Sequence, residues 1–414
     1  MDLIIGAGAT GLAYASFTSN PYLVVDADTE PGGYCKTIRR NGFVWDYSGH
    51  FFHFRDPELE KWIFENVNPD VIRHVRKLTQ INYHGRYIDF PFQKNIHQLD
   101  KEEFIDCLYD LFNTTGGSYS NFKEMLYSKF GRSIAEKFLI PYNTKLYATD
   151  LNRLDSEAMG RFFPYADKEE IIANFRNADS ASYNASFTYP STGAIEYINS
   201  LLSRLNPECI SLGEKVLSID PEAHTATTNR RTIHYDNLIS TIPFPRLLDL
   251  AGVDYDHSVY SWNRVLVFNL GFDRKGKDTT NNWVYFPDSD LAFYRVGYYD
   301  NILGGDRMSL YVELGFGKDG DIDVEFWHKR VLEDLAKAGI TEGCTLVDEH
   351  SVIMDPAYVH ISAASQSDVA ARKAALASRS IYSIGRYGSW TYCSIEDGMK
   401  EARILASQVV APQA

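Results

Sequence analysis

The sequence Leu3-Ile4-Ile5-Gly6-Ala7-Gly8-Ala9-Thr10-Gly11 decides the fold of this chain. A short apolar run meets Gly-x-Gly-x-x-Gly, and the apolar sequence Leu12-Ala13-Tyr14-Ala15 follows it. In a strand–turn–helix unit the first glycine permits the tight turn, and the second lets the backbone approach a pyrophosphate. The third lets the helix pack closely on the strand. The helix N-terminus offers unpaired N–H groups to the phosphates, so these residues predict a dinucleotide-binding unit.

A second apolar run favours the dinucleotide over ordinary glycine turns. Tyr22-Leu23-Val24-Val25 ends at Asp26. An acidic side chain about twenty residues after such a fingerprint meets the ribose hydroxyls of a dinucleotide. A glycine triplet alone also occurs in ordinary turns, and the acid at this spacing is what favours a nucleotide site. The cofactor-binding candidates in this region are Gly6, Gly8, Ala9, Thr10, Gly11, Asp26, Ala27, Gly33, Tyr34 and Thr37.

Length, charge and cysteine content limit the class of protein. The 414 residues exceed one comfortable core, which predicts two or three packed units. The net charge of −14 argues against broad binding to nucleic acid or to an anionic membrane surface. The five cysteines have no CxxC or metal-ligand spacing, so we expect a cytoplasmic protein without a bound metal. No apolar run has the length of a membrane span.

Two further segments favour FAD over NAD. Gly32-Gly33-Tyr34 follows Asp26 closely, and the C-terminal Gly385-Arg386 precedes a helical pattern from about 395 to 409. That second helix N-terminus is placed to meet the same cofactor. The three segments together resemble the flavoprotein superfamily of amine oxidases, which bind FAD, whereas plain turns are the alternative. The further cofactor-binding candidates are Val216, Gly385, Arg386, Asp397 and Met399.

Hydrophobic patterning organises the rest of the chain. Residues 98–178 have helical spacing, and strand-like runs return after 185. We expect an α/β fold, α+β overall, with a Rossmann-like FAD-binding domain, an inserted helical domain and an antiparallel β-sheet substrate domain. The predicted bounds are 1–80, 205–245 and 375–414 for the discontinuous FAD-binding domain, 97–180 for the helical insert, and 81–96, 181–204 and 246–374 for the β-sheet domain.

Within that superfamily the chain resembles the UDP-galactopyranose mutase family, most closely its eukaryotic type. The resemblance runs nearly from end to end, in short motifs that follow the family's order. These motifs are Gly49–His53, Phe90–Ile96, Pro141–Tyr147, Asn184–Pro190, Asn282–Pro287, Phe293–Arg295 and Gly385–Trp390.

The resemblance implies an isomerase of polysaccharide biosynthesis, an intramolecular transferase that interconverts pyranose and furanose forms of UDP-galactopyranose or a related nucleotide sugar. In the family reaction N5 of reduced FAD attacks the anomeric carbon, and the diphosphate leaves and later returns, without net redox change. Because the cofactor is the nucleophile, no protein nucleophile is needed. The partners to consider are the nucleotide sugar, NAD(P)H or another reductant, and a second copy in a homo-oligomer.

The family pattern assigns residues to the departing diphosphate. Arginine forks suit this charge, and Arg161 and Arg295 stand at the family's arginine positions. His50 and His53 lie on the loop that the family places near the flavin, and all four are predicted to be catalytic. The tyrosines at the family's positions are Tyr285, Tyr358 and Tyr392. A solvated arginine, packed tyrosines and packed histidines are the structural alternatives.

Other residues match family positions for the base and the sugar. They are Phe90, Phe92, Gln93, Asn143, Tyr147 and Asn184. The family usually has tryptophan where this chain has Tyr147, and tyrosine where it has Phe90. These two departures leave the base and the sugar open.

Two other classes remain as alternatives. An FAD-dependent oxidase or desaturase of the amine-oxidase superfamily shares the cofactor motifs but needs no nucleotide-sugar pocket. It leaves the paired arginines without a role. The second alternative is a non-catalytic flavin- or nucleotide-binding protein.

Overall fold

Short apolar strands from both ends of the chain form one parallel sheet. The computed structural model describes residues 1–114, 116–176 and 185–409. The sheet order is β20-β13-β1-β2-β9, and β1 and β13 are buried throughout, as expected for central strands covered on both faces. The strands are β1 (Asp2–Ile5), β2 (Tyr22–Asp26), β9 (Ile210–Leu212), β13 (Asn237–Ser240) and β20 (Ile381–Ser383).

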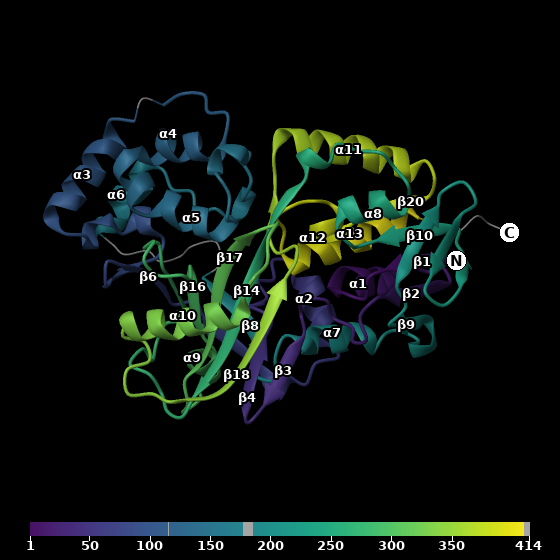
Figure 1. Ribbon diagram of the computed structural model, residues 1–414, viewed down its shortest axis with the longest axis horizontal. Coiled ribbons are helices and arrows are strands. Elements are labelled where there is room, and N and C mark those ends of the chain that lie inside the picture. Colours follow the sequence, from purple (N-terminus) through teal and green to yellow (C-terminus); the bar gives the residue numbers. More distant parts are fainter. Residues whose placement is uncertain (115, 177–184, 410–414) are drawn as a thin grey trace.

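Helices from distant parts of the chain cover this sheet. α1 (Ala9–Phe17) packs against α13 (Ile395–Gln408) and α7 (Ile195–Leu202), so the first and last helices lie side by side (Figure 1). The close approach of α1 to β1 requires Gly11, because a Cβ there would overlap the carbonyl oxygen of Gly6. The other helices of this half are α2 (Pro57–Phe64), α8 (Phe244–Leu250), α11 (Ala363–Ala377) and α12 (Gly385–Gly388).

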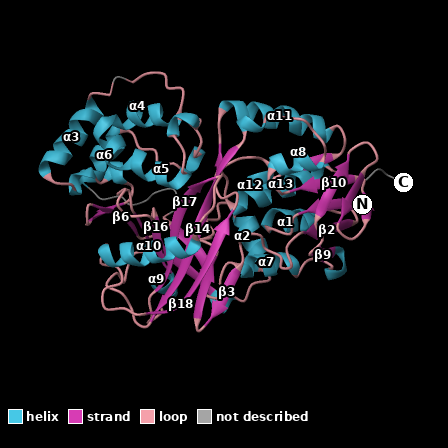
Figure 2. Cartoon of the chain, in the orientation of Figure 1, coloured by secondary structure: helices cyan, strands magenta, loops and turns pink. Residues whose placement is uncertain are grey.

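A second, larger sheet lies beside the first unit. Its order is β18-β14-β17-β16-β15-β6-β7, with β19 paired to β14. Its pairings are antiparallel except for β15 with β6, and α10 (Val324–Lys337) covers one face (Figure 2). The strands are β6 (Thr79–Tyr83), β7 (Arg86–Asp89), β14 (Ser261–Phe272), β15 (Trp283–Tyr285), β16 (Arg295–Tyr298), β17 (Ser309–Gly317), β18 (Leu346–Met354) and β19 (Val359–His360), and α9 (Tyr299–Leu303) joins β16 to β17.

A helical insert forms the lobe at the upper left of Figure 1. Its helices are α3 (Lys101–Phe112), α4 (Phe122–Ile134), α5 (Ile140–Tyr147) and α6 (Lys168–Arg176). α5 contacts β17 of the large sheet, which fixes the insert against that sheet. The predicted fold class is confirmed: a Rossmann-like α/β unit, a helical insert and a mainly antiparallel sheet.

Small sheets connect these parts. β5 pairs with β8 apart from the large sheet, although β8 follows the helical insert directly in sequence. The remaining strands are β3 (Thr37–Arg40), β4 (Phe43–Asp46), β5 (Ile72–Arg76), β8 (Ser186–Pro190), β10 (Val216–Asp220), β11 (Thr225–Thr228) and β12 (Thr232–His234). No helix in the described part of the chain combines the length and apolar character that crossing a bilayer requires.

Two predicted helical regions are confirmed, and several helices were missed. The helical region at 98–178 contains α3 to α6, and the predicted helix at 395–409 is α13. Helices α7, α8, α9 and α11 were not predicted. α11 has an alanine- and serine-rich sequence that buries little apolar surface and has weak hydrophobic contrast.

A buried carboxylate connects β4 to β8 and α7. Asp46 is fully buried and accepts hydrogen bonds from the Thr37 hydroxyl at 2.6 Å and the Tyr189 hydroxyl at 2.7 Å. The Ala194 N–H also donates to it, at 3.2 Å. Burial raises the pKa of Asp46 to about 6, although these donors oppose the rise.

The raised pKa of Asp46 predicts that the free energy of unfolding depends on pH. A raised pKa in the folded state stabilises the protein below the unfolded pKa of 3.8, and that stabilisation is lost as pH rises through about 6. A shift of two units corresponds to about 3 kcal/mol. The unmodified protein is therefore expected to lose about this amount of unfolding free energy between pH 4 and pH 7 through Asp46, whereas Asp46→Asn loses none of it. The stability of the variant relative to the unmodified protein should rise by the same amount over this range. Urea titrations at both pH values measure it, and parallel profiles for the two proteins would contradict the expectation.

Candidate functional site

A cavity of about 690 Å³ lies where the parallel sheet, the large sheet and the helical insert meet. Its wall includes the turn after β1, Asp26 at the end of β2, and the turn after β20. These are carboxyl ends of parallel strands, where ligands of open α/β sheets bind. Its opposite wall comes from the large sheet and from α5. The cavity therefore joins a nucleotide-type cradle to a second surface suited to a substrate.

The cradle has space for a phosphate group at its centre. Gly6 has φ +111°, which a side chain would strain, and a Cβ on Gly8 would meet no atom within 4 Å. The Asp26 carboxylate accepts from the N–H groups of Ala7 at 2.6 Å and Asp28 at 2.8 Å. These bonds hold the carboxylate beside the N-terminus of α1, where an acid and free N–H groups suit a ribose and a pyrophosphate.

The C-terminal segment completes this cradle. Gly385 has φ +82°, and Cβ atoms on Gly385 and Gly398 would approach the Thr10 hydroxyl to 2.9 and 2.5 Å. Glycines at these two positions therefore let α12 and α13 reach α1. The predicted cofactor residues that line the cavity are Gly6, Gly8, Ala9, Thr10, Asp26, Gly33, Tyr34, Gly385 and Arg386.

Other predicted cofactor residues lie behind that lining. The Thr37 hydroxyl bonds to Asp46, and Met399 is fully buried in α13. The predicted residues outside the lining are Gly11, Ala27, Thr37, Val216, Asp397 and Met399.

An ion pair on the large sheet forms the substrate-facing wall. Arg295 of β16 and Glu313 of β17 stand directly opposite each other, with Nε–Oε2 at 2.6 Å and Nη2–Oε1 at 2.8 Å. The Ser48 hydroxyl also donates to Glu313. Although burial opposes it, the Glu313 carboxylate raises the pKa of Arg295 well above its usual value. Arg295 is therefore a permanent cation in the cavity wall, paired with the Glu313 carboxylate.

Tyrosines surround this ion pair. Trp283 donates from Nε1 to the Tyr285 hydroxyl at 2.7 Å, and the Phe90 ring lies 4.9 Å from the Tyr285 ring. Tyr358 and Tyr392 stack at 5.8 Å, and the Arg386 guanidinium lies over both rings, at 5.2 and 4.6 Å. The wall thus combines cations with hydroxyl donors, a suitable set for a charged oxygen-rich ligand.

The two predicted histidines line the cavity as neutral rings. Burial lowers the pKa of His50 to about 4, and Arg386 adds to this effect. Burial also lowers the pKa of His53 to about 4, while its Nδ1 lies 2.9 Å from the Ser186 carbonyl oxygen, which fixes that nitrogen as the donor. At neutral pH these rings add hydrogen-bonding groups to the site without adding charge.

The helical insert presents an amide to the cavity. Asn143 lines it, donates from Nδ2 to the Leu139 carbonyl at 2.6 Å, and leaves Oδ1 unpaired within the described structure. Phe92, Gln93 and Tyr147 lie behind the wall: Phe92 stacks on Phe138, and Gln93 donates to the Pro164 carbonyl. The predicted residue Asn184 lies outside the described residues.

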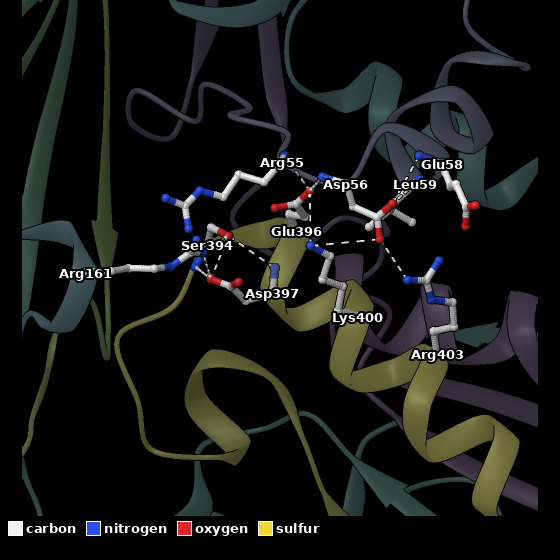
Figure 3. Close-up of polar contacts among 10 residues, drawn as sticks. All are labelled: Arg55, Asp56, Glu58, Leu59, Arg161, Ser394, Glu396, Asp397, Lys400 and Arg403. Carbon is white, nitrogen blue, oxygen red and sulfur yellow. Dashed lines mark hydrogen bonds and ion pairs between the residues drawn. The ribbon is translucent and has the colours of Figure 1, made fainter. Parts of the chain in front are cut away.

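Arg161 is not among the residues that line the cavity. Its guanidinium pairs with Asp397 and lies 3.3 Å from the Ser394 hydroxyl, at the N-terminus of α13 (Figure 3). The same helix end carries Glu396, which accepts from the N–H groups of Arg55 and Asp56 at 2.8 and 2.7 Å. Arg161 therefore connects the helical insert to the cofactor-side helix, although its neighbour Phe162 lines the cavity.

Some cavity residues were not predicted from the sequence. Tyr142 and Trp283 lie inside motifs that the resemblance uses, so the motifs contained a signal for them. Thr241 follows β13 and lies at the same sheet edge as Asp26, which strand order alone would indicate. Lys77, Tyr311 and the segment 354–357 reach the cavity only through tertiary structure, and no local pattern marks them.

Comparison with known proteins places this geometry in context. A family model described as an NAD(P)-binding Rossmann-like domain matches residues 4–64. A crystal structure of reduced UDP-galactopyranose mutase is similar with a TM-score of 0.89 and 25% identity, over 98% of this chain and 93% of that chain.

Two more distant structures share the fold. A protein from an Exiguobacterium species assigned as a protoporphyrinogen oxidase has a TM-score of 0.78 and 16% identity, over 98% of both chains. Putrescine oxidase bound to putrescine has a TM-score of 0.65 and 13% identity, also over 98% of both chains. The resemblance seen in the motifs is confirmed as a structural likeness over nearly the whole chain, with a Rossmann-like dinucleotide-binding segment at its start.

Removing one partner of the ion pair between Arg295 and Glu313 is expected to destabilise the folded protein. Glu313→Gln keeps the shape of the side chain but leaves the Arg295 guanidinium buried without its counter-charge. Breaking a buried pair from one side typically costs about 3–5 kcal/mol. Urea unfolding should therefore show a loss near 3 kcal/mol, whereas Glu333→Gln, at an exposed helix position, should change stability by less than about 0.5 kcal/mol. Equal effects of the two variants would contradict this account of the wall.

Proposed function

We propose that this protein is an FAD-dependent mutase that interconverts the pyranose and furanose forms of a nucleotide sugar. The observation that supports this most directly is one cavity with two kinds of wall. A dinucleotide cradle forms one side, and Arg295 with its tyrosines forms the other. An enzyme that oxidises a neutral or cationic amine has no need of cations facing its substrate.

The residues of the cradle fit FAD. Gly6, Gly8 and the N-terminus of α1 would hold the pyrophosphate, Asp26 would bind a ribose, and Arg386 would lie at the flavin end. The open space at Gly8 and the aligned N–H groups of α1 are the observations that support this assignment. When bound and reduced, the flavin supplies the nucleophile for the anomeric carbon, which agrees with the absence of a predicted protein nucleophile.

The protein's own residues have to stabilise the departing diphosphate. Arg295 offers a fixed charge, and Tyr285, Tyr358 and Tyr392 offer neutral hydroxyl donors around it. These donors are held by packing before substrate arrives, so little reorganisation is needed when negative charge develops. The neutral ring of His53 uses its N–H on the Ser186 carbonyl, so its Nε2 can accept a hydrogen bond from a sugar hydroxyl, and the neutral ring of His50 can donate or accept one.

The nucleoside end is assigned to the helical insert. The unpaired Oδ1 of Asn143 offers an acceptor to a base. Phe92 and Gln93 would act as supports for the lining residues Phe138 and Pro164. Arg161 would bind the diphosphate only if its guanidinium left the ion pair with Asp397 and bound the substrate instead.

A screen of nucleotide hexoses with dithionite-reduced protein tests the proposal. UDP-, GDP- and dTDP-hexoses would be incubated with the reduced enzyme, and furanose formation followed by chromatography. Furanose product without net consumption of reductant is expected. Substrate-dependent oxygen consumption would instead favour the oxidase or desaturase alternative, and no turnover of any nucleotide sugar would favour a binding protein.

Arg295→Ala is expected to reduce turnover severely while bound FAD is retained. The loss of a charged donor at the diphosphate corresponds to about 2–4 kcal/mol, or roughly 30- to 1,000-fold in rate. Turnover and the flavin absorbance of the purified protein are measured together. Because Ala at this position leaves Glu313 buried and unpaired, the double variant Arg295→Ala/Glu313→Gln is compared, and normal activity in it would remove Arg295 from the site.

Gly8→Val tests the cofactor assignment independently of activity. The backbone at Gly8 has φ −82°, which any residue can adopt, and the added methyl groups would occupy the space assigned to the pyrophosphate. We expect the purified variant to have an unchanged circular dichroism spectrum and a flavin content lowered at least about tenfold. Gly117→Val, on a loop with open space around it, is the matched control. A normal flavin content in Gly8→Val would contradict the assignment.

A further inference from the structure

Lys77 places an ammonium group in the cavity wall. It directly follows β5, and its backbone N–H donates to the Ala185 carbonyl at 2.9 Å. Its Nζ lies 5.0 Å from the centre of the Phe90 ring and 5.8 Å from that of Trp283. The side chain is thus held against aromatic faces, with its charge turned to the cavity that contains the nucleotide cradle.

Within the described residues this cation has no anionic partner. Burial lowers the pKa of Lys77 to about 8, and no nearby carboxylate counteracts that effect. A half-buried cation without a partner loses part of its hydration without compensation from an opposite charge. The neighbouring rings offset only part of this loss, because a cation–π contact is weaker than an ion pair in a desolvated site.

Lys145 is a half-buried lysine with a structural role, and it provides a comparison for Lys77. Burial lowers the pKa of Lys145 to about 8 as well. Its ammonium, however, donates at 2.6–3.0 Å to four carbonyl oxygens, those of Phe286, Asp288, Leu291 and Phe293. Lys77 makes no such set of bonds in the described structure, so its charge is available to a ligand.

The strand register separates Lys77 from the Arg295 pair. Trp283 pairs with Thr79, two residues after Lys77, whereas Arg295 pairs with Tyr285, two residues after Trp283. At about 3.3 Å per residue, the two backbone positions differ by about 13 Å along the strand direction. The two cations therefore come from separate levels of the cavity wall. Lys77 also lies close enough to His53 to lower its pKa, which places the ammonium beside the histidine loop.

We propose that the sugar of the substrate carries a carboxylate, as in a nucleoside-diphosphate hexuronate, and that Lys77 binds this carboxylate. The inference rests on the proposed function, which assigns the diphosphate to Arg295 and the sugar to the histidine loop. A single ammonium acts as a point charge and suits one carboxylate on a ring. Lys77 is then the residue that distinguishes an acidic sugar from a neutral one.

Binding to the oxidised holoenzyme tests this without turnover. UDP, UDP-galactose and UDP-galacturonate are titrated by calorimetry, because the two sugars differ only at C6. UDP-galacturonate is expected to bind at least about tenfold more tightly than UDP-galactose. Lys77→Met should abolish this preference and leave the affinity for UDP unchanged, whereas Lys77→Arg should retain it. Lys61→Met, at an exposed position of α2, is the control that should behave as the unmodified protein.

Each other outcome would overturn a defined part of the argument. Equal affinity for the two sugars would overturn the inference while the proposed function stands. If Lys77→Met weakened UDP and both sugars by the same factor, Lys77 would instead bind the diphosphate. If UDP itself did not bind, the proposed function would fail first, and this inference with it.

Discussion

The cofactor half of this structure depends on the contact between Gly11 and the carbonyl of Gly6. No side chain fits between them, so only glycine lets α1 begin directly against β1. The position of α1 then determines where the end of the chain can pack, because Gly385 and Gly398 approach Thr10 on the same helix. Three close contacts, one with a backbone carbonyl and two with the Thr10 side chain, therefore place the first strand, the first helix and the last two helices around one end of the cavity.

The other half of the site depends on charge. Glu313 is fully buried and Arg295 is mostly covered, so the wall holds a cation whose counter-charge is built into the next strand. His50 and His53 are neutral because burial disfavours their charged forms. Lys77 differs from these groups, since its charge is kept without a partner among the described residues. The cations Arg295 and Lys77 thus come from different segments of the cavity wall.

Sequence reasoning succeeded where function requires a local motif. The glycine turn, Asp26 and the segment after β20 could be recognised because each needs particular residues at fixed spacing. Reasoning from sequence could not place Lys77 or Tyr311, because their approach to the cavity results from strand pairing between distant segments. Nor could it show that Arg161 pairs with Asp397, or that Phe92 and Gln93 support the lining from behind. Those outcomes depend on side-chain packing, which a motif does not record.

The parallel sheet has a consequence for the order of events during synthesis. β1 lies between β2 and β13, and β20 completes the sheet next to β13, yet β20 and α13 are made only after some 380 residues have left the ribosome. The cradle is therefore open on one side until α13 has been made, and the apolar face of α1 has no partner helix there before that point. The nascent chain cannot bind its cofactor in the finished cradle before β20 and α13 are available to pack.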